Sequence, residues 1–186
     1  MRSLRLEILI AGRGGQGILL IGRILGKAIA KYTNYYILAS ESYSAEVRGG
    51  DSRVDLIIAD TYDEADFIKV RSADIALFMH QSQLEAYLRL VKENATIFID
   101  QTNIIDHSVM REISSSKVYL RPYTEIAERV FGTGRIANII ALGHMIKTTR
   151  IVDPEAVERV IIEEVPREWL ELDRRAFRYS VEKLDS

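Results

Sequence analysis

The first stretch of the sequence whose residue types could do chemistry is a glycine-rich hexapeptide: Gly12, Arg13, Gly14, Gly15, Gln16 and Gly17. Glycine adopts backbone conformations closed to other residues and lets backbone amides approach an anion without obstruction. An apolar run at residues 6–11 precedes the hexapeptide, and apolar residues at helical spacing follow it up to Tyr32. The amides would therefore lie at the positively polarised start of a helix, which predicts phosphate binding. The alternative is a turn that only allows a strand to pass into a close-packed helix.

The hexapeptide also fits the G-x-G-x-x-G fingerprint of dinucleotide-binding proteins. Glu41 lies near the end of the second predicted strand, roughly where a Rossmann domain keeps the acid that binds a ribose hydroxyl. A stand-alone Rossmann-type dehydrogenase and a small nucleotide-binding regulatory protein are therefore alternatives. A dehydrogenase also needs a substrate-binding region, for which a chain of 186 residues leaves little room.

A second candidate motif occupies residues 42–53. Its residues with binding chemistry are Ser42, Tyr43, Glu46, Arg48, Gly49, Gly50 and Arg53. The two arginines are fixed cations suited to phosphate or carboxylate, and the glycines allow close backbone approach. We expect this motif beside the first one, because successive strand ends meet at one edge of a doubly wound sheet. The alternative is a solvated loop in which the arginines pair with Glu46 or Asp51.

The positioning elements follow from hydrophobic periodicity. Short apolar runs predict strands at residues 6–11, 35–39, 54–59, 75–79, 96–99 and 118–120. Helical spacing predicts helices at residues 18–32, 84–91, 122–132, 135–145 and 154–166, and in the C-terminal segment. Strands alternating with helices predict one α/β domain over residues 1–186, a three-layer α/β/α sandwich with a Rossmann-like, mainly parallel sheet.

Composition excludes several classes of function. The 25 Lys and Arg against 27 Asp and Glu give no basic excess, which disfavours nucleic-acid binding. The absence of cysteine excludes disulfides, a thiolate nucleophile and cysteine-ligated zinc or iron–sulfur clusters within this chain. The three histidines have no metal-ligand spacing. No apolar run approaches the roughly 20 residues that span a bilayer, so we expect no membrane association and a cytoplasmic location.

The apolar helix at residues 135–145 contains two notable polar residues, Asn138 and His144. A buried Asn138 needs a partner, which we expect to be loop backbone more than a ligand, and His144 is interpreted as structural. A helix this apolar is buried or faces a partner. We expect it, with residues 42–53, at or beside an interface, and self-association as a dimer when the chain is alone. Asp100, after a predicted strand, is either a functional acid or a turn and capping residue.

Taken in this order, the two motifs resemble those of the gamma subunits of 2-oxoacid:ferredoxin oxidoreductases. That family's pattern is a strand, G-x-G-G-Q-G, a helix, and then a tyrosine-containing loop with E-x-R-G-G, which this chain matches at residues 12–17 and 46–50. The apolar helix bearing Asn138 also resembles the family, and the similarity covers roughly the first 145 residues. The version of the loop is similar to that of 2-oxoglutarate enzymes, although Ser44 and Ala45 depart from it.

The resemblance implies an assembly that oxidatively decarboxylates a 2-oxoacid, with 2-oxoglutarate expected, to an acyl-coenzyme A and reduces ferredoxin. Thiamine diphosphate, magnesium and iron–sulfur clusters would belong to partner subunits. This chain would hold no cofactor, metal or catalytic residue of its own, and it would be inactive in isolation. The resemblance also implies that coenzyme A is the ligand of the two motifs and Asn138, with this chain contributing to assembly and to the coenzyme A path.

Overall fold

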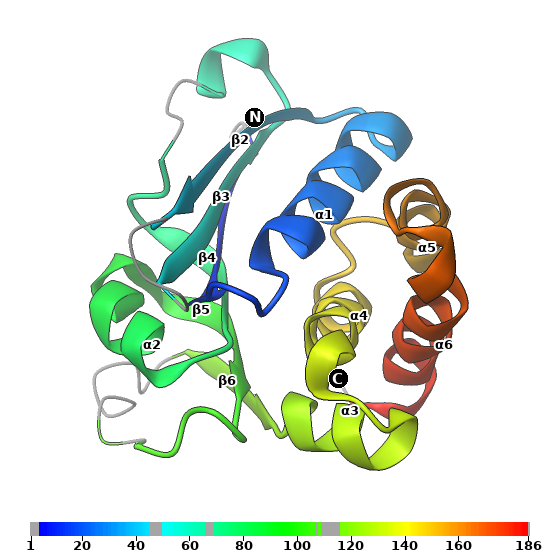
Figure 1. Cartoon of the computed structure of the whole chain (residues 1–186). Helices are drawn as coiled ribbons and strands as arrows, with labels where there is room; N and C mark the ends of the chain where they lie inside the picture. Colours follow the sequence, from blue (N-terminus) through cyan, green and yellow to red (C-terminus); the bar gives the residue numbers. More distant parts are fainter. Residues whose placement is uncertain (1–3, 45–49, 66–68, 107, 109–115, 186) are drawn as a thin grey trace.

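A central six-stranded sheet organises the chain. The computed structural model describes residues 4–44, 50–65, 69–106, 108 and 116–185. The strands, in the spatial order β2-β3-β1-β4-β5-β6 (Figure 1), are β1 (Arg5–Arg13), β2 (Tyr36–Tyr43), β3 (Asp51–Ala59), β4 (Ala73–Phe78), β5 (Val91–Asp100) and β6 (Lys117–Arg121). Strands β1, β4, β5 and β6 are successive parallel neighbours, which confirms the predicted mainly parallel α/β fold.

Strand β3 is antiparallel to both of its neighbours, β1 and β2. The connection from β2 to β3 is too short for a parallel crossover, which needs a dozen or more residues, so the chain returns as a hairpin. Both strands are also longer than predicted. The register pairs Gly12 with Ser52 and Tyr43 with Ser52, so the start of β3 lies at the same sheet edge as the end of β1.

The helices cover the two faces of the sheet unequally (Figure 1). One face carries α1 (Ile18–Tyr32), α4 (Ala137–Thr149), α5 (Pro154–Glu164) and α6 (Arg167–Lys183), with α3 (Tyr123–Phe131) at its end, and the other carries α2 (Gln81–Tyr87). Single 3-10 turns are η1 (Tyr62–Glu64), η2 (Leu88–Leu90) and η4 (Gly134–Ile136). Within the described parts of the chain, no helix has the length and apolar character needed to cross a membrane.

Helix α4 is buried inside its own chain. Every residue from Ala137 to Ile146 is buried, and the helix packs closely against α6. Gly143 makes this possible, because a Cβ there would lie 3.0 Å from the backbone oxygen of Phe177. The apolar helix is therefore buried within its own chain and does not itself present an interface surface. That it lies beside an interface stays a prediction.

The predicted helix at residues 84–91 begins and ends earlier than expected, since α2 runs over Gln81–Tyr87. Helix α2 ends at Tyr87, a 3-10 turn follows, and Val91 is already the first residue of β5, where it pairs with Ala73. The apolar side chains of η2 and early β5 recur at a spacing that periodicity cannot separate from a helix. Helices α5 and α3 match their local signals: Asp153 caps the first, and Gly132, with φ 77°, ends the second.

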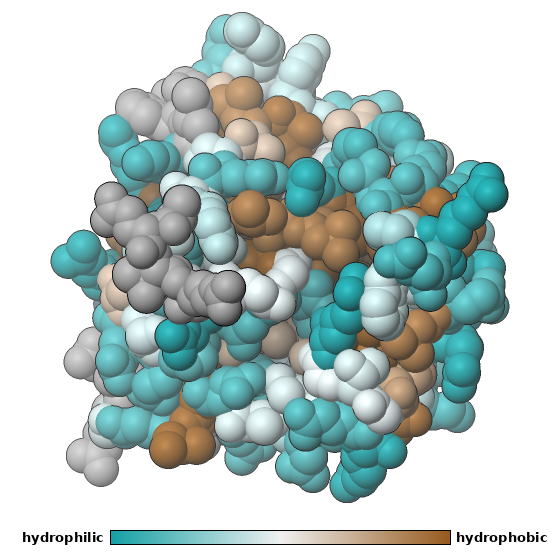
Figure 2. Space-filling view, in the orientation of Figure 1, coloured by the Kyte–Doolittle hydropathy of each residue, from teal (hydrophilic) through white to brown (hydrophobic). Residues whose placement is uncertain are grey.

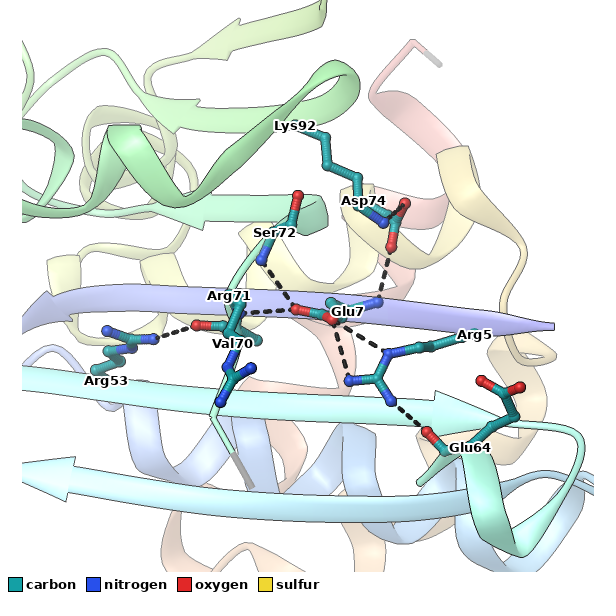
Figure 3. A network of polar contacts seen from close by, with 9 residues as sticks. All are labelled: Arg5, Glu7, Arg53, Glu64, Val70, Arg71, Ser72, Asp74 and Lys92. Atoms are coloured by element: carbon teal, nitrogen blue, oxygen red, sulfur yellow. Dashed lines mark hydrogen bonds and ion pairs between the residues drawn. The ribbon is translucent and has the colours of Figure 1, made fainter. Parts of the chain in front are cut away.

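The buried carboxylate of Glu7 stabilises the end of the sheet that lies away from the glycine motifs (Figure 3). Glu7 accepts hydrogen bonds from the backbone N–H groups of Arg71 (2.8 Å) and Ser72 (3.0 Å), and it pairs with Arg5 at 3.2 Å. The backbone N–H of Glu7 donates to Asp74 at 2.9 Å. These bonds fix the chain entering β4 against β1, so β1 is held firmly at the end away from the candidate site.

Candidate functional site

The glycine-rich hexapeptide forms the turn between β1 and α1. Gly15 and Gly17 have φ values of 94° and 70°, in the left-handed region that favours glycine. A Cβ on Gly12 would lie 2.7 Å from the Cδ1 atom of Ile18. The N–H of Gly14 donates to the carbonyl of Gly50 at 2.8 Å. The structure thus brings the first motif into contact with the end of the second.

Gln16 ties this turn across the crevice between β1 and β4. Its Nε2 donates to the carbonyl of Met79 at 2.9 Å, and its Oε1 accepts from the N–H of Arg13 at 2.7 Å. Helices α1 and α2 leave the sheet here toward opposite faces, and ligands of doubly wound folds bind at such a point. A second cavity of about 320 Å³ adjoins it, bordered by Gln16, Asn103, Thr124 and Arg135 among others.

A cavity of about 380 Å³ opens beside the start of α1. It is lined by Gly15, Gly17, Ile18, Leu19, Leu20, Tyr43, Ser52, Arg135, Asn138 and Asp173. Figure 2 shows apolar surface at the centre of the view, over the first half of α1. Gly17 offers no side-chain cap, and the first turn of α1 contains no acidic residue. The N–H groups of a first helical turn have no intrahelical partner, so this end of the cavity favours an anion.

Asn138, from α4, stabilises the turn between β1 and α1. Its Nδ2 donates to the carbonyl of Gly17 at 3.1 Å, and the residue is 3% exposed. A Cβ on Gly17 would collide with this amide, approaching its Cγ to 3.1 Å. Asn138 therefore bonds to loop backbone, as predicted, and it also borders the cavity.

Helix α6 and the 3-10 turn η4 supply the far wall through residues that the sequence analysis missed. The guanidinium carbon of Arg135 lies 3.7 Å from the centroid of the Trp169 ring, and Asp173 follows one helical turn later. Burial raises the pKa of Asp173 to about 6, and the guanidinium of Arg135 opposes that rise. One signal could have found Asp173: it is an acid on the apolar face of its helix, between Trp169 and Phe177.

Arg53 does not face this cavity, contrary to prediction. Its guanidinium pairs with Asp55 at 2.8 Å, donates to the carbonyl of Val70 at 3.4 Å (Figure 3), and lies 4.7 Å from the centroid of the Tyr87 ring. Side chains alternate along β3, so Ser52 takes the cavity-facing position and Arg53 the opposite one. Burial is the larger influence on the pKa of Asp55 and raises it, with Arg53 opposing.

The remaining residues of the second motif divide into two groups. Tyr43 lines the cavity, whereas Ser42 is exposed and paired with Arg53 in the β2–β3 register. Glu46, Arg48 and Gly49 lie outside the described residues.

Two other polar groups have structural partners. Asp100 is fully buried and accepts from Thr124 Oγ1 at 2.5 Å and from Asn103 Nδ2 at 2.8 Å, which joins the end of β5 to α3. His144 hydrogen-bonds with the Tyr123 hydroxyl and with the carbonyl of Asp185, both at 2.7 Å, and burial lowers its pKa to about 4. The described part of the chain contains no cluster of three or more His, Asp or Glu side chains that could hold a metal.

Comparisons with known proteins agree with one another. Residues 7–183 match the family described as pyruvate ferredoxin/flavodoxin oxidoreductase. The 2-oxoglutarate synthase subunit KorC of Methanothermobacter marburgensis is 36% identical over 165 residues, which cover 88% of each chain. The crystal structure of a keto/oxoacid ferredoxin oxidoreductase gamma subunit from Geobacter sulfurreducens superposes with a TM-score of 0.82 at 30% identity, covering 97% of this chain and 96% of that one.

A more distant similarity extends to a much longer chain. A 2-oxoglutarate:ferredoxin oxidoreductase from Magnetococcus marinus, solved with 2-oxoglutarate, coenzyme A and succinyl-CoA bound, matches with a TM-score of 0.80 at 20% identity. The match covers 100% of this chain and 32% of that one. At this level of identity, the similarity establishes a shared fold.

Proposed function

The chain belongs to the pyruvate ferredoxin/flavodoxin oxidoreductase family, and we propose that it is the gamma subunit of a 2-oxoacid:ferredoxin oxidoreductase that acts on 2-oxoglutarate. Family membership confirms the resemblance that the two glycine motifs indicated. The comparisons lend no support to a stand-alone dehydrogenase or a nucleotide-binding regulatory protein.

The proposed reaction needs chemistry that this chain lacks. A 2-oxoacid loses carbon dioxide, its acyl group passes to the thiol of coenzyme A, and two electrons reduce ferredoxin. With no cysteine, this chain cannot ligate the clusters that carry those electrons. We therefore assign thiamine diphosphate, magnesium and the iron–sulfur clusters to partner subunits, and to this chain a role in assembly and in the coenzyme A path. A cytoplasmic location and a homodimer of the isolated chain stay predictions.

One observation supports the coenzyme A assignment most directly: the cavity at the uncapped start of α1 borders the guanidinium of Arg135. Coenzyme A carries a diphosphate and a further phosphate. Unpaired helix N–H groups and a guanidinium are the donors that phosphate oxygens accept best. The stacking of Arg135 on Trp169 holds the guanidinium in place before any ligand arrives.

The test compares Michaelis constants in the enzyme assembled from this chain and its co-expressed partners. Arg135→Ala should raise KM for coenzyme A about tenfold or more, since a charge-assisted hydrogen bond contributes about 1.5–3 kcal/mol, and leave KM for 2-oxoglutarate unchanged. Arg135→Lys should recover part of the loss, because it keeps the charge without the planar fork. Arg129→Ala is the control, since that side chain is 71% exposed on α3.

Two results would contradict the proposal. Equal changes in both Michaelis constants would assign Arg135 to structure. An assembled enzyme that oxidises no 2-oxoacid with coenzyme A, tested across a panel including 2-oxoglutarate and pyruvate, would overturn the function itself. Arg48→Ala, outside the described residues, is predicted to behave like Arg135→Ala.

A further inference from the structure

Strand β2 forms one edge of the sheet, and β3 is its one strand partner within the described chain (Figure 1). The register between the two strands is unbroken, and the N–H of Ser44 donates to the carbonyl of Asp51 at 2.9 Å. Backbone direction alternates along an antiparallel strand, so the even-numbered residues of β2 direct their backbone groups at β3. The outward N–H and C=O groups belong to the odd-numbered residues Ile37, Ala39, Glu41 and Tyr43. Within the described residues, these outward groups have no hydrogen-bond partner.

The opposite edge of the sheet, β6, is protected against pairing with another chain. It has five residues and begins with Lys117. Gln101 donates to the carbonyl of Arg121, so the carbonyl of Leu120 points outward, and Arg121 Nη1 covers it at 2.9 Å. Short length, charged side chains, proline and bulges are the features that keep edge strands from pairing. Strand β2 has eight residues with no Lys, Arg or Pro, and its register has no bulge. Its open edge therefore favours a strand-pairing partner.

The outward groups of β2 are arranged symmetrically about Ser40. In an antiparallel pair centred there, Ile37 faces Tyr43 of a second copy, and Ala39 faces Glu41. Every outward N–H then meets a carbonyl, which gives about eight backbone hydrogen bonds. A centre at Ala39 or at Glu41 leaves Tyr43 or Ile37 without a partner in β2. The strand is therefore complementary to itself along its whole length, as a two-fold interface requires.

A groove beside this edge matches the charge of the approaching strand. It has a volume of about 190 Å³, and it is lined by Gly22, Arg23, Gly26, Lys27, Ala30, Ala39, Glu41 and Val54. Glu41 of a second copy would arrive opposite Ala39, within this lining. It would meet the side chains of Arg23 and Lys27, which are 54% and 49% exposed and each pair with one acid of their own chain. The two-fold axis repeats this contact, so the edge is complementary to itself in charge as well.

We propose that two copies of this chain pair along β2, antiparallel and with a two-fold axis at Ser40, so that their sheets join into one, and that they stay paired in the assembled enzyme. Ser40 itself supports this position. Its hydroxyl is shielded from water and has no hydrogen-bond partner among the described residues. On the axis, a χ1 rotation lets each Ser40 hydroxyl bond to the other, since facing side chains lie closest in a non-hydrogen-bonded pair. The proposal rests on the strand edge and is independent of the proposed function.

The absence of cysteine in this chain makes the register measurable by cross-linking. Ser40→Cys places two thiols on the axis, where the Cα atoms of a non-hydrogen-bonded pair lie about 4.5 Å apart, within disulfide range. Under mild oxidation, the full-length variant should become mostly a covalent dimer. Ser42→Cys is the matched control, because Ser42 is more exposed than Ser40. Its Cα atoms would lie roughly 14 Å apart in the pair, so it should cross-link about tenfold more slowly or less.

Sedimentation equilibrium of the full chain, over a hundredfold range of concentration, measures the pairing itself. The wild type should reach twice the 21.2 kDa of one chain. Ala39→Pro replaces an outward N–H by a ring carbon and leaves the hydrogen bonds to β3 intact. It should raise the dissociation constant of the dimer about tenfold or more, since one hydrogen bond is lost on each side of the axis. Val118→Pro is the control, because it removes an outward N–H from β6, two residues before Leu120, and should leave the constant unchanged.

Circular dichroism verifies that each variant folds, and the cysteine variants test the pairing even if Ala39→Pro unfolds. A wild type that stays monomeric, an unchanged dissociation constant in folded Ala39→Pro, or cross-linking of Ser42→Cys as fast as that of Ser40→Cys overturns the proposal. Ser40→Cys that cross-links alone but not after assembly with co-expressed partner subunits would assign the edge to a partner's strand, which also overturns it. None of these measurements uses enzyme activity, so their failure is distinct from failure of the proposed function.

Discussion

Replacing Gly17 tests how the glycine turn is held. Gly17→Ala places a side chain at φ 70°, which costs about 1–2 kcal/mol of unfolding free energy. The new Cβ would also displace the amide of Asn138, whose Cγ would otherwise lie 3.1 Å away. Displacement breaks the bond to the Gly17 carbonyl and leaves a buried amide unsatisfied, at about 1–3 kcal/mol. We therefore expect Gly17→Ala to lower the unfolding free energy by about 2–5 kcal/mol.

Asn138→Ala removes the amide with which the new Cβ of Gly17→Ala would collide. On its own, Asn138→Ala should lower the unfolding free energy by about 1–3 kcal/mol. The Gly17 carbonyl is not left unsatisfied, because it still accepts a hydrogen bond from the N–H of Ile21 at 3.2 Å. In the double variant, the alanine at position 17 meets no amide and adds only its backbone strain. The double variant should therefore be more stable than the sum of the single losses by about 1–3 kcal/mol.

Urea unfolding of the four proteins at one pH, followed by circular dichroism, measures this coupling. Gly132→Ala is the matched control, because Gly132 has φ 77° and a Cβ there would meet nothing within 4 Å. It should cost only the backbone strain, about 1–2 kcal/mol, and show no coupling to Asn138→Ala. Losses at Gly17 and Asn138 that add within about 0.5 kcal/mol, or equal costs at Gly17 and Gly132, would refute this account of the turn.

Three further predictions follow from individual side chains. Burial lowers the pKa of His144 to about 4 from 6.5, so the unfolded chain binds more protons in this range. In the Asp173→Asn variant, which lacks the opposing titration of Asp173, the unfolding free energy should fall by about 2 kcal/mol between pH 8 and pH 5; a flat urea-derived profile of that variant would contradict it. Burial raises the pKa of Asp173 from 3.8 to about 6, so the ionised carboxylate destabilises the fold above pH 6. Asp173→Asn should therefore stabilise the chain by about 1–3 kcal/mol at pH 8. The same gain at pH 4 would show that the ionised carboxylate is not the cause. Gly14→Val crowds the Tyr43 ring, whose Cε2 would lie 3.0 Å from the new Cβ. The variant should lose assembly or ligand binding, measured by co-purification and activity, before it unfolds. Full assembly and activity would show that the contact between Gly14 and Tyr43 is dispensable.

Local signals in the sequence were sufficient wherever neighbouring residues decide the structure. The apolar run before the hexapeptide, the Asp153 cap and the terminating Gly132 each act within a few residues of where they stand. The partner of Asn138 was also predictable, because an amide in an apolar helix must be satisfied and a glycine turn offers free backbone groups.

Features that depend on distant pairing could not be predicted in the same way. The direction of β3 decides which of Ser52 and Arg53 faces the cavity, and a one-residue difference in alternation exchanges them. Charge alone favoured Arg53 as a ligand-binding residue. Its guanidinium instead forms an ion pair with Asp55, two positions along the same strand. The position of Asp173 on the apolar face of α6 predicts that it is buried, but that it lines this cavity depends on how α6 packs on α4, which no pattern within α6 reveals.

The bond between Asn138 and Gly17 joins residues 121 positions apart. Strands β1, β2 and β3, with α1, use only the first third of the chain, so this part can pair early during synthesis through contacts of modest sequence separation. The turn between β1 and α1 nevertheless lacks its rear support and its far wall until α4 and α6 have emerged and docked. Its final geometry is therefore one of the last features that folding completes, and a nascent chain that stops short of α6 would carry the glycine motif without the site around it.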